Sequence, residues 1–188
     1  GMLIAEALNL GGLIKEEGYI LKTGGYEVVD LGDDVYTQGK PHPMIDPEVR
    51  IKKILECAKD PQTGVILLDC MLGYGCHPDM AGALAPAIRE AQKIAKADGR
   101  ELYFVASVCG TRQDPQDYDR AVAELKECGV LVEESNARAI RLALKLKGID
   151  YKENTRGHVE AAVDETPLPE PDEKIMELLN TKPRVINV

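Results

Sequence analysis

The sequence predicts an α/β fold, a flavodoxin-like, three-layer α/β/α arrangement with a parallel sheet and helices on both faces. Strand-like and helical segments alternate along the chain with short connections, which is typical of right-handed βαβ crossovers. Two of the strands, residues 64–72 and 102–108, are apolar throughout, as strands covered on both faces are. Aromatic residues are only 4% of the chain, so Val, Ile, Leu and Ala must fill the core, which is the usual filling of such a sheet.

The first segments are the least regular. Residues 2–16 predict a helix, although it contains two glycines. After a Gly-Gly turn, residues 26–33 (YEVVDLGD) predict a strand of the parallel sheet that ends in acidic and glycine residues. Three prolines and one glycine in residues 35–47 exclude a continuous helix there.

The later elements follow one another regularly. Asp46 and Pro47 suit the N-cap and first position of a helix that runs to about Lys59. The remaining expected elements are a strand at 64–72, a helix at 80–96, a strand at 102–108, a helix at 116–128, a strand at 130–134 and a helix at 136–147.

The last residues break this alternation. We expect residues 2–149 to form a flavodoxin-like domain and residues 150–188 to form a tail that wraps its surface as part of the same domain. Within the tail, residues 172–179 suit a short helix and residues 181–188 suit a terminal strand. Because the sequence stops while it is still apolar, we expect it to be cut from a longer polypeptide.

Charge and cysteine usage limit the classes of function. The formal net charge of −9 argues against binding nucleic acid or an anionic membrane surface, which needs a basic face. No apolar run reaches membrane-spanning length. The five cysteines are scattered and form no CxxC pair, which favours free thiols in a reducing cytoplasm over disulfides or a zinc site.

Three unusual loops follow predicted strands, and we expect all three at the carboxyl edge of the sheet, where open α/β sheets bind ligands. They are LGDDVYTQGKPHP (31–43), LGYGCHPD (72–79) and CGTRQDPQ (109–116). Their clustering is the main physical argument for a functional site.

The second loop has two interpretations. Gly73 and Gly75 would let a ligand approach the backbone, and the helix start near Asp79 would offer free N–H groups to a phosphate or carboxylate. His77 would then act as a donor or a proton carrier, which makes it the catalytic candidate of this chain. Alternatively, the loop is an ordinary turn in which Asp79 caps the helix, and the spacing alone favours this interpretation.

The third loop adds further candidates. Gly110 can take an unusual backbone angle, and Thr111 offers a hydroxyl group. We therefore expect an anion to bind between residues 73–79 and 109–111, opposed by the carboxylate of Asp79. Cys109 is a candidate nucleophile, but no histidine accompanies it in this segment, so that structural packing is the favoured interpretation. Packing is also expected for Cys57, Cys70 and Cys128.

The first loop contains acids and an imidazole. Asp33 and Asp34 could hold Mg²⁺, but a turn that they merely punctuate is the favoured interpretation. His42, between two prolines, suits an exposed loop and a site equally well, whereas His158 in the tail is expected to be exposed. No metal-ligand spacing, Walker loop or complete dinucleotide fingerprint is present, so no metal site is predicted.

Three segments together resemble the FdrA family of acyl-CoA synthetase-like proteins: DLGDDVYTQGKPHPMIDPEVR (30–50), VILLDCMLGYGCHPDMAGALAPAI (65–88) and ASVCGTRQDPQ (106–116). The resemblance runs from about Val29 to Leu144, and PRVINV at the end also looks like a family segment. Through this family the chain is similar to the C-terminal ligase domain of the succinyl-CoA synthetase β-subunit.

The resemblance implies a domain of an NDP-forming ligase in which a phosphohistidine carries phosphoryl between nucleotide and acyl-CoA sites. Gly73 and Gly75 would then cradle the phosphate, with the helix start at Pro78 and Asp79 behind them. CoA, ATP or ADP and Mg²⁺ are implied for the full assembly, not for this chain alone. The chain carries no CoA-binding Rossmann unit, ATP-grasp domain or GHAG-type segment, so we assign no phosphohistidine role to His77.

Two further functions stay open. FdrA-type proteins are also linked to carbamoyl-group metabolism in purine breakdown, so the chain could be part of a carbamoyltransferase acting with oxamate. It could also be a non-catalytic assembly domain. For the ligase function the expected partners are CoA-binding and phosphohistidine-bearing domains or subunits, and a homo-oligomer stays open as well.

Overall fold

A computed structural model describes residues 1–10, 13, 17–23, 25–149 and 151. Contacts between Cα atoms divide the chain into one unit from Gly1 to Tyr151 and a second from Lys152 to Val188. Apart from Tyr151, the predicted wrapping tail with its short helix and terminal strand, and His158, lie outside the described residues. All the elements described below belong to the first unit.

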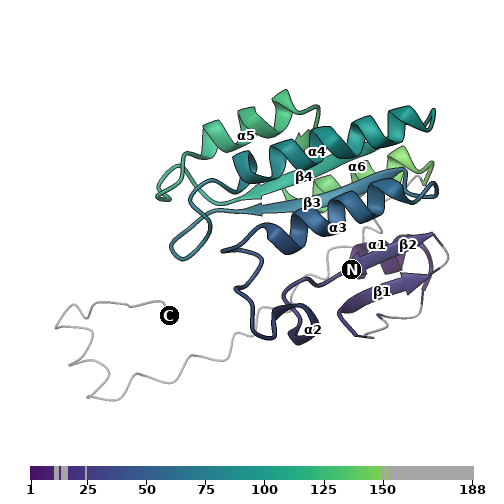
Figure 1. The fold of residues 1–188 in the computed structure, drawn as a ribbon. Coiled ribbons are helices and arrows are strands. Elements are labelled where there is room, and N and C mark those ends of the chain that lie inside the picture. Colours follow the sequence, from purple (N-terminus) through teal and green to yellow (C-terminus); the bar gives the residue numbers. More distant parts are fainter. Residues whose placement is uncertain (11–12, 14–16, 24, 150, 152–188) are drawn as a thin grey trace, which may run out of the picture. The chain divides into compact units, whose positions relative to one another are not determined.

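A parallel sheet of three strands forms the centre of this unit (Figure 1). The strands are β3 (Val65–Met71), β4 (Tyr103–Cys109) and β5 (Leu131–Glu133), and they pair in the order β3-β4-β5. Met71 pairs with Cys109, so β3 and β4 end side by side at their carboxyl ends. The predicted α/β class with a parallel sheet is therefore confirmed.

Helices cover both faces of the sheet. The helices α3 (Glu48–Lys59), α4 (Met80–Ala97) and α5 (Tyr118–Glu127) lie side by side on one face, with α4 in the middle (Figure 1). The helix α6 (Asn136–Leu146) packs against β3 and β4 from the other face. This arrangement gives the three layers that the alternation of elements predicts.

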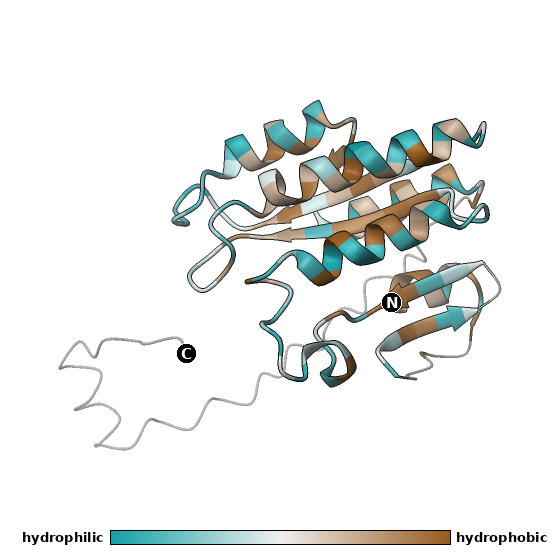
Figure 2. Ribbon diagram, in the orientation of Figure 1, coloured by the Kyte–Doolittle hydropathy of each residue, from teal (hydrophilic) through white to brown (hydrophobic). Residues whose placement is uncertain are grey.

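The core is built from aliphatic side chains and alanines, as the composition predicts. Its largest fully buried side chain is Phe104, in the central strand β4. Colouring by hydropathy shows that β3 and β4 are largely apolar and that polar and apolar segments alternate along α3, α4 and α5 (Figure 2). Buried alanines and larger apolar residues alternate along α4, which lets this helix pack closely against its neighbours; they are Ala81, Leu84, Ala85, Ile88, Ala91 and Ala95.

The helix starts are capped as their sequences suggest. The N-cap of α3 is Pro47, one residue after the predicted Asp46, and it makes no side-chain cap bond. Asp46 still accepts a hydrogen bond from the backbone N–H of Glu48 at 2.9 Å. Asp79, Asp117 and Ser135 cap α4, α5 and α6 with their side chains. Each cap satisfies a backbone N–H that the helix leaves without a partner.

Two predictions near the N-terminus are wrong. The first helix, α1 (Met2–Ala7), does not continue through the predicted range 2–16, because residues 8–10 are not helical. The strand β2 (Tyr26–Val29) does not join the parallel sheet; it pairs antiparallel with β1 (Tyr19–Thr23), which was not predicted.

A hairpin explains this second difference. The runs YILKT and YEVV are separated only by Gly24 and Gly25, and Gly25 has a φ of +103°. A two-residue turn with glycine joins adjacent strands directly, whereas a parallel pairing would need a long crossover. β2 therefore pairs with β1 in the hairpin and not with a strand of the parallel sheet.

The segment after β2 is mostly irregular, as predicted, apart from the single turn of α2 (Asp34–Thr37). Over the described ranges, no helix is long and apolar enough to cross a membrane.

Candidate functional site

The second and third expected loops meet at the carboxyl end of β3, and the end of the first loop lies next to them. The loop after β3 lies beside the loop after β4, because Met71 pairs with Cys109 and the N–H of Leu72 donates to the carbonyl of Cys109 at 2.9 Å. Met44, directly after the first loop, also reaches this place: the N–H of His77 donates to its carbonyl at 2.7 Å. The first loop follows β2, a strand of the antiparallel hairpin. The predicted cause of the clustering, a common edge of the parallel sheet, is therefore wrong for this loop.

The side chain of Gln116 joins the two sheet loops. Its Oε1 accepts the N–H of Gly73 at 2.9 Å. Its Nε2 donates to the carbonyl of Gly73 at 3.0 Å and to that of His77 at 3.2 Å. One amide thus makes three hydrogen bonds to the glycine loop and continues the pairing of β3 beyond its last residue.

The tip of the glycine loop is open. Gly73 and Gly75 have φ values of +132° and +82°, a region that side chains rarely allow. Tyr74 between them is 91% exposed. In the described part of the chain no residue accepts a hydrogen bond from the N–H of Tyr74 or of Gly75, so these two amides are available to a ligand.

The two loop histidines, His42 and His77, sit in the same type of turn. Nδ1 of His77 accepts the N–H of Asp79 at 3.0 Å, and Nδ1 of His42 accepts the N–H of Met44 at 3.2 Å. Each histidine precedes a proline and bonds the residue after it. Because Nδ1 is an acceptor, each neutral ring carries its proton on Nε2 and presents an N–H donor there.

Asp79 folds onto its own helix. One carboxylate oxygen accepts the N–H of Gly82 at 3.1 Å, and the other accepts from Arg120 at 2.6 Å. A Cβ on Gly82 would lie 2.5 Å from Oδ2 of Asp79, so only glycine leaves room for this cap. The geometry is that of the alternative interpretation, in which Asp79 caps α4.

A second carboxylate occupies the space between the two sheet loops. Oδ2 of Asp114 accepts the N–H of Thr111 at 2.6 Å and lies 3.3 Å from its hydroxyl. The same oxygen would be 3.0 Å from a Cβ on Gly110, and Oδ1 would be 3.9 Å from one on Gly73. An external anion bound between residues 73–79 and 109–111 would have to displace this carboxylate.

Gly110 has a different role from the predicted one. Its φ is not positive, so it takes no unusual backbone angle. It is needed for close packing instead, because an added Cβ would lie 2.7 Å from Cβ of Leu72. The two loops could not approach so closely with a larger residue at this position.

The cations near the loops are already paired. Nε and Nη2 of Arg112 each donate to one carboxylate oxygen of Asp119 at 2.8 Å. Hydrogen bonds from Arg112 hold the pKa of Asp119 below its ordinary value. Since Arg120 is bonded to Asp79, the site offers an anion mainly the backbone N–H groups of Tyr74 and Gly75.

The acids of the first loop do not gather into a site. Asp33 caps α2 by accepting the N–H of Val35 at 3.1 Å, and Asp34 is exposed in the first turn of that helix. Among the residues that the structure describes, no group of three His, Cys, Asp or Glu side chains could hold a metal ion. The structure thus places Asp33 at the N-cap of α2.

The cysteines differ in accessibility. Cys70 and Cys128 are buried, as predicted, whereas Cys57 is only half-buried. Cys109 is exposed, so the prediction that it is packed in the interior is wrong. Cys109 is the last residue of β4, at the carboxyl end of the sheet, and this position explains its exposure.

These environments predict different thiol reactivity. Burial raises the pKa of Cys70 to about 11, despite the nearby charge of Arg50. At pH 8 such a thiol is about one part in a thousand thiolate, the reactive form. We expect iodoacetamide to label Cys109 rapidly and Cys70 only in denaturant, as measured by mass spectrometry of peptides. Equal labelling rates for the two thiols in the folded protein would contradict this.

Sequence reasoning missed Gln116, Asp114, Arg120 and Gly82. Asp114 and Gln116 flank Pro115 in a loop that directly follows a buried strand, which is a signal for residues at the sheet edge. The partners of these side chains are set by the contact between loops about 40 residues apart, and no local pattern reveals them.

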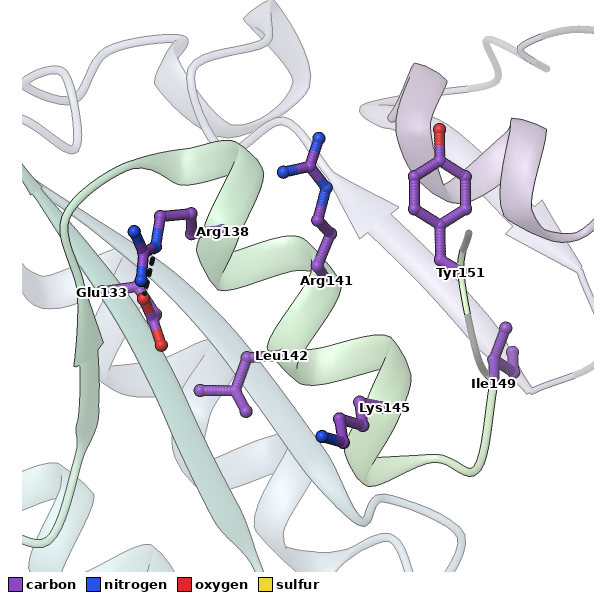
Figure 3. A pocket seen from close by; sticks show the side chains of 7 residues that line it. All are labelled: Glu133, Arg138, Arg141, Leu142, Lys145, Ile149 and Tyr151. Atoms are coloured by element: carbon purple, nitrogen blue, oxygen red, sulfur yellow. Dashed lines mark hydrogen bonds and ion pairs between the residues drawn. The ribbon is translucent and has the colours of Figure 1, made fainter. Parts of the chain in front are cut away.

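One hollow of about 400 Å³ lies along α6 (Figure 3). Arg138 in its wall donates to Glu133 at 3.1 Å and to Glu134 at 3.2 Å, so its charge is compensated. None of the residues singled out by the sequence lines it; the lining residues are Glu133, Arg138, Arg141, Leu142, Lys145, Ile149 and Tyr151.

Comparison with known proteins identifies the family. Residues 2–146 match the model of the CoA-ligase family. The chain is also 44% identical over 115 residues to YahF, an uncharacterized protein of Escherichia coli (strain K12). That match covers 61% of this chain and 22% of YahF, so the chain spans only a small part of this relative. The chain belongs to the CoA-ligase family.

Proposed function

We propose that this chain is the ligase domain of an FdrA-type, NDP-forming acyl-CoA synthetase-like protein of the cytoplasm. It would contribute the Gly73–Gly75 loop to a phosphoryl-relay active site that other domains complete. The observation that carries the proposal is the loop itself: two glycines with positive φ follow β3, and the N–H groups at the tip are left for a ligand.

The chemistry of the loop suits a phosphate group. Backbone N–H groups at an open loop tip stabilise an anion without a charged side chain. We place the phosphate at the amides of Tyr74 and Gly75, because the carboxylate of Asp114 fills the space between the two sheet loops. CoA, ATP or ADP and Mg²⁺ would bind to the other domains of the assembly, one of which would bear the phosphohistidine.

The test uses the complete natural protein. It is incubated with CoA, ATP, Mg²⁺ and a panel of carboxylic acids, and thioester formation is followed by mass spectrometry. Gly75→Val should lower the rate about 10–100-fold, because a branched side chain cannot adopt a φ of +82° without strain of roughly 1–3 kcal/mol.

Gly39→Val is the matched control. Gly39 also has a positive φ of +70° and open space around it, but it lies after α2. It should reduce stability without the selective loss of activity. Absence of thioester with every acid, or equal activity of the two variants, would contradict the proposal. Turnover of carbamoyl phosphate with oxamate would favour a carbamoyltransferase instead.

The chain alone is expected to be inactive. A phosphoryl relay needs nucleotide, CoA and phosphohistidine sites together, and this chain corresponds to only 22% of its relative YahF. We therefore expect no thioester from the isolated chain under conditions in which the complete protein is active. Turnover by the isolated chain that depends on both ATP and CoA would refute this expectation.

A further inference from the structure

We propose that Gln116 is a positioning residue that presents Nε2–H of His77 as a fixed hydrogen-bond donor to an anionic oxygen. The use of this donor in catalysis rests on the proposed function. The positioning itself does not, and it can be tested on this chain alone.

The hydrogen bonds of Gln116 require an amide. The side chain accepts from the N–H of Gly73 and donates to two carbonyl groups, those of Gly73 and His77. A carboxylate of the same shape can only accept, and an alkyl group can do neither. Gln116 is half-buried and supplies this pattern just where the strand ladder of β3 ends.

His77 is held at three points, one of them by Gln116. Its N–H donates to Met44 at 2.7 Å, its carbonyl accepts from Gln116 at 3.2 Å, and its Nδ1 accepts the N–H of Asp79 at 3.0 Å. Two of the three bonds fix the backbone and the third fixes the ring. The imidazole therefore has one orientation and one neutral tautomer.

This tautomer decides what the ring can do. A proton on Nε2 leaves no lone pair there, so this nitrogen can neither attack phosphorus nor abstract a proton. It can donate a hydrogen bond to a carboxylate or phosphoryl oxygen. Of the two roles that the sequence leaves open for His77, donor and proton carrier, the geometry points to the donor.

Gln116→Glu is the sharpest test, because its effect depends on pH. A protonated carboxyl group can accept from the N–H of Gly73 and donate one hydrogen bond, whereas an ionised one can only accept. In this variant at pH 7, we expect hydrogen exchange of the Gly73 amide to be about tenfold faster than in the unmodified chain. Acidification should reverse the change, and Gln116→Ala should show it at every pH.

Nitrogen NMR of the imidazole supplies the second readout. The unmodified chain should show His77 as the Nε2–H tautomer, and the ionised Gln116→Glu variant should lose this single tautomer. Gln113→Glu is the matched control, since it makes the same charge change at an exposed position of the same loop and should alter neither readout. Unchanged core resonances around Phe104 would show that the variants remain folded.

Two outcomes would overturn the proposal: an Nδ1–H tautomer of His77 in the unmodified chain, or a Gly73 exchange rate and His77 tautomer that do not change in either Gln116 variant. Failure of the complete protein to form a thioester would remove the proposed function but would leave these measurements standing. The two proposals can therefore fail separately.

Discussion

Phe104→Ala is expected to lower the free energy of unfolding by about 3–5 kcal/mol. Phe104 has no exposed surface and is the largest fully buried side chain, in the strand that has a neighbour on each side. Its removal loses apolar burial and leaves a cavity that a parallel sheet between helix layers cannot readily close. Since domains are typically stable by about 5–15 kcal/mol, the variant should be close to unfolding.

Urea denaturation followed by circular dichroism measures this effect. Tyr103→Ala is a suitable control, because the neighbouring Tyr103 is 42% exposed at the start of the same strand. We expect the control to lose under about 1 kcal/mol. A loss for Phe104→Ala no larger than that of the control would mean that the core is packed differently from the one described.

Gly110→Ala is expected to destabilise the fold by about 1–3 kcal/mol, although it adds a single methyl group. The new Cβ would lie 2.7 Å from Cβ of Leu72 and 3.0 Å from Oδ2 of Asp114. Leu72 cannot move without breaking its backbone hydrogen bond to Cys109, and Asp114 cannot move without breaking its bond to Thr111. The two sheet loops would therefore have to separate.

The control for this variant is Gly64→Ala. Gly64 also lacks a positive φ, and a Cβ there would meet nothing closer than Nζ of Lys147 at 3.9 Å. Its unfolding free energy should stay within about 0.5 kcal/mol of the parent, or rise slightly because alanine restricts the unfolded chain. Equal stability of the two variants, measured by urea denaturation, would show that the loops are not in close contact.

The sequence was a good guide to the elements that depend on local signals. The helices at 80–97 and 118–127 and the strands before them agree with the prediction to within a few residues, because their apolar patterns and capping residues are local. The hairpin at 19–29 was missed, because the apolar pattern of YEVV does not reveal whether its partner strand is parallel or antiparallel.

The site was predictable only in part. The glycines at 73 and 75 and the histidine at 77 were singled out as candidates, since their residue types are unusual directly after a strand. The bonds of Gln116, Asp114 and Arg120 were not found, because each depends on the distance between two loops in the folded chain. Gly110 was singled out for the wrong reason and Gly82 was missed, since close approach, and not backbone angle, makes both glycines necessary.

The hydrogen bonds of Gln116 to the glycine loop also affect the entropy with which this chain would bind its proposed partner domains. Gln116 orders the backbone around Gly73 during folding, before any partner arrives. Immobilising a loop is part of the entropic penalty of association, and a preorganised loop avoids it. Calorimetry of docking to the proposed partner domains should therefore show a less unfavourable entropy for the parent chain than for Gln116→Ala. Gln116→Ala should weaken this binding mainly by raising the dissociation rate constant.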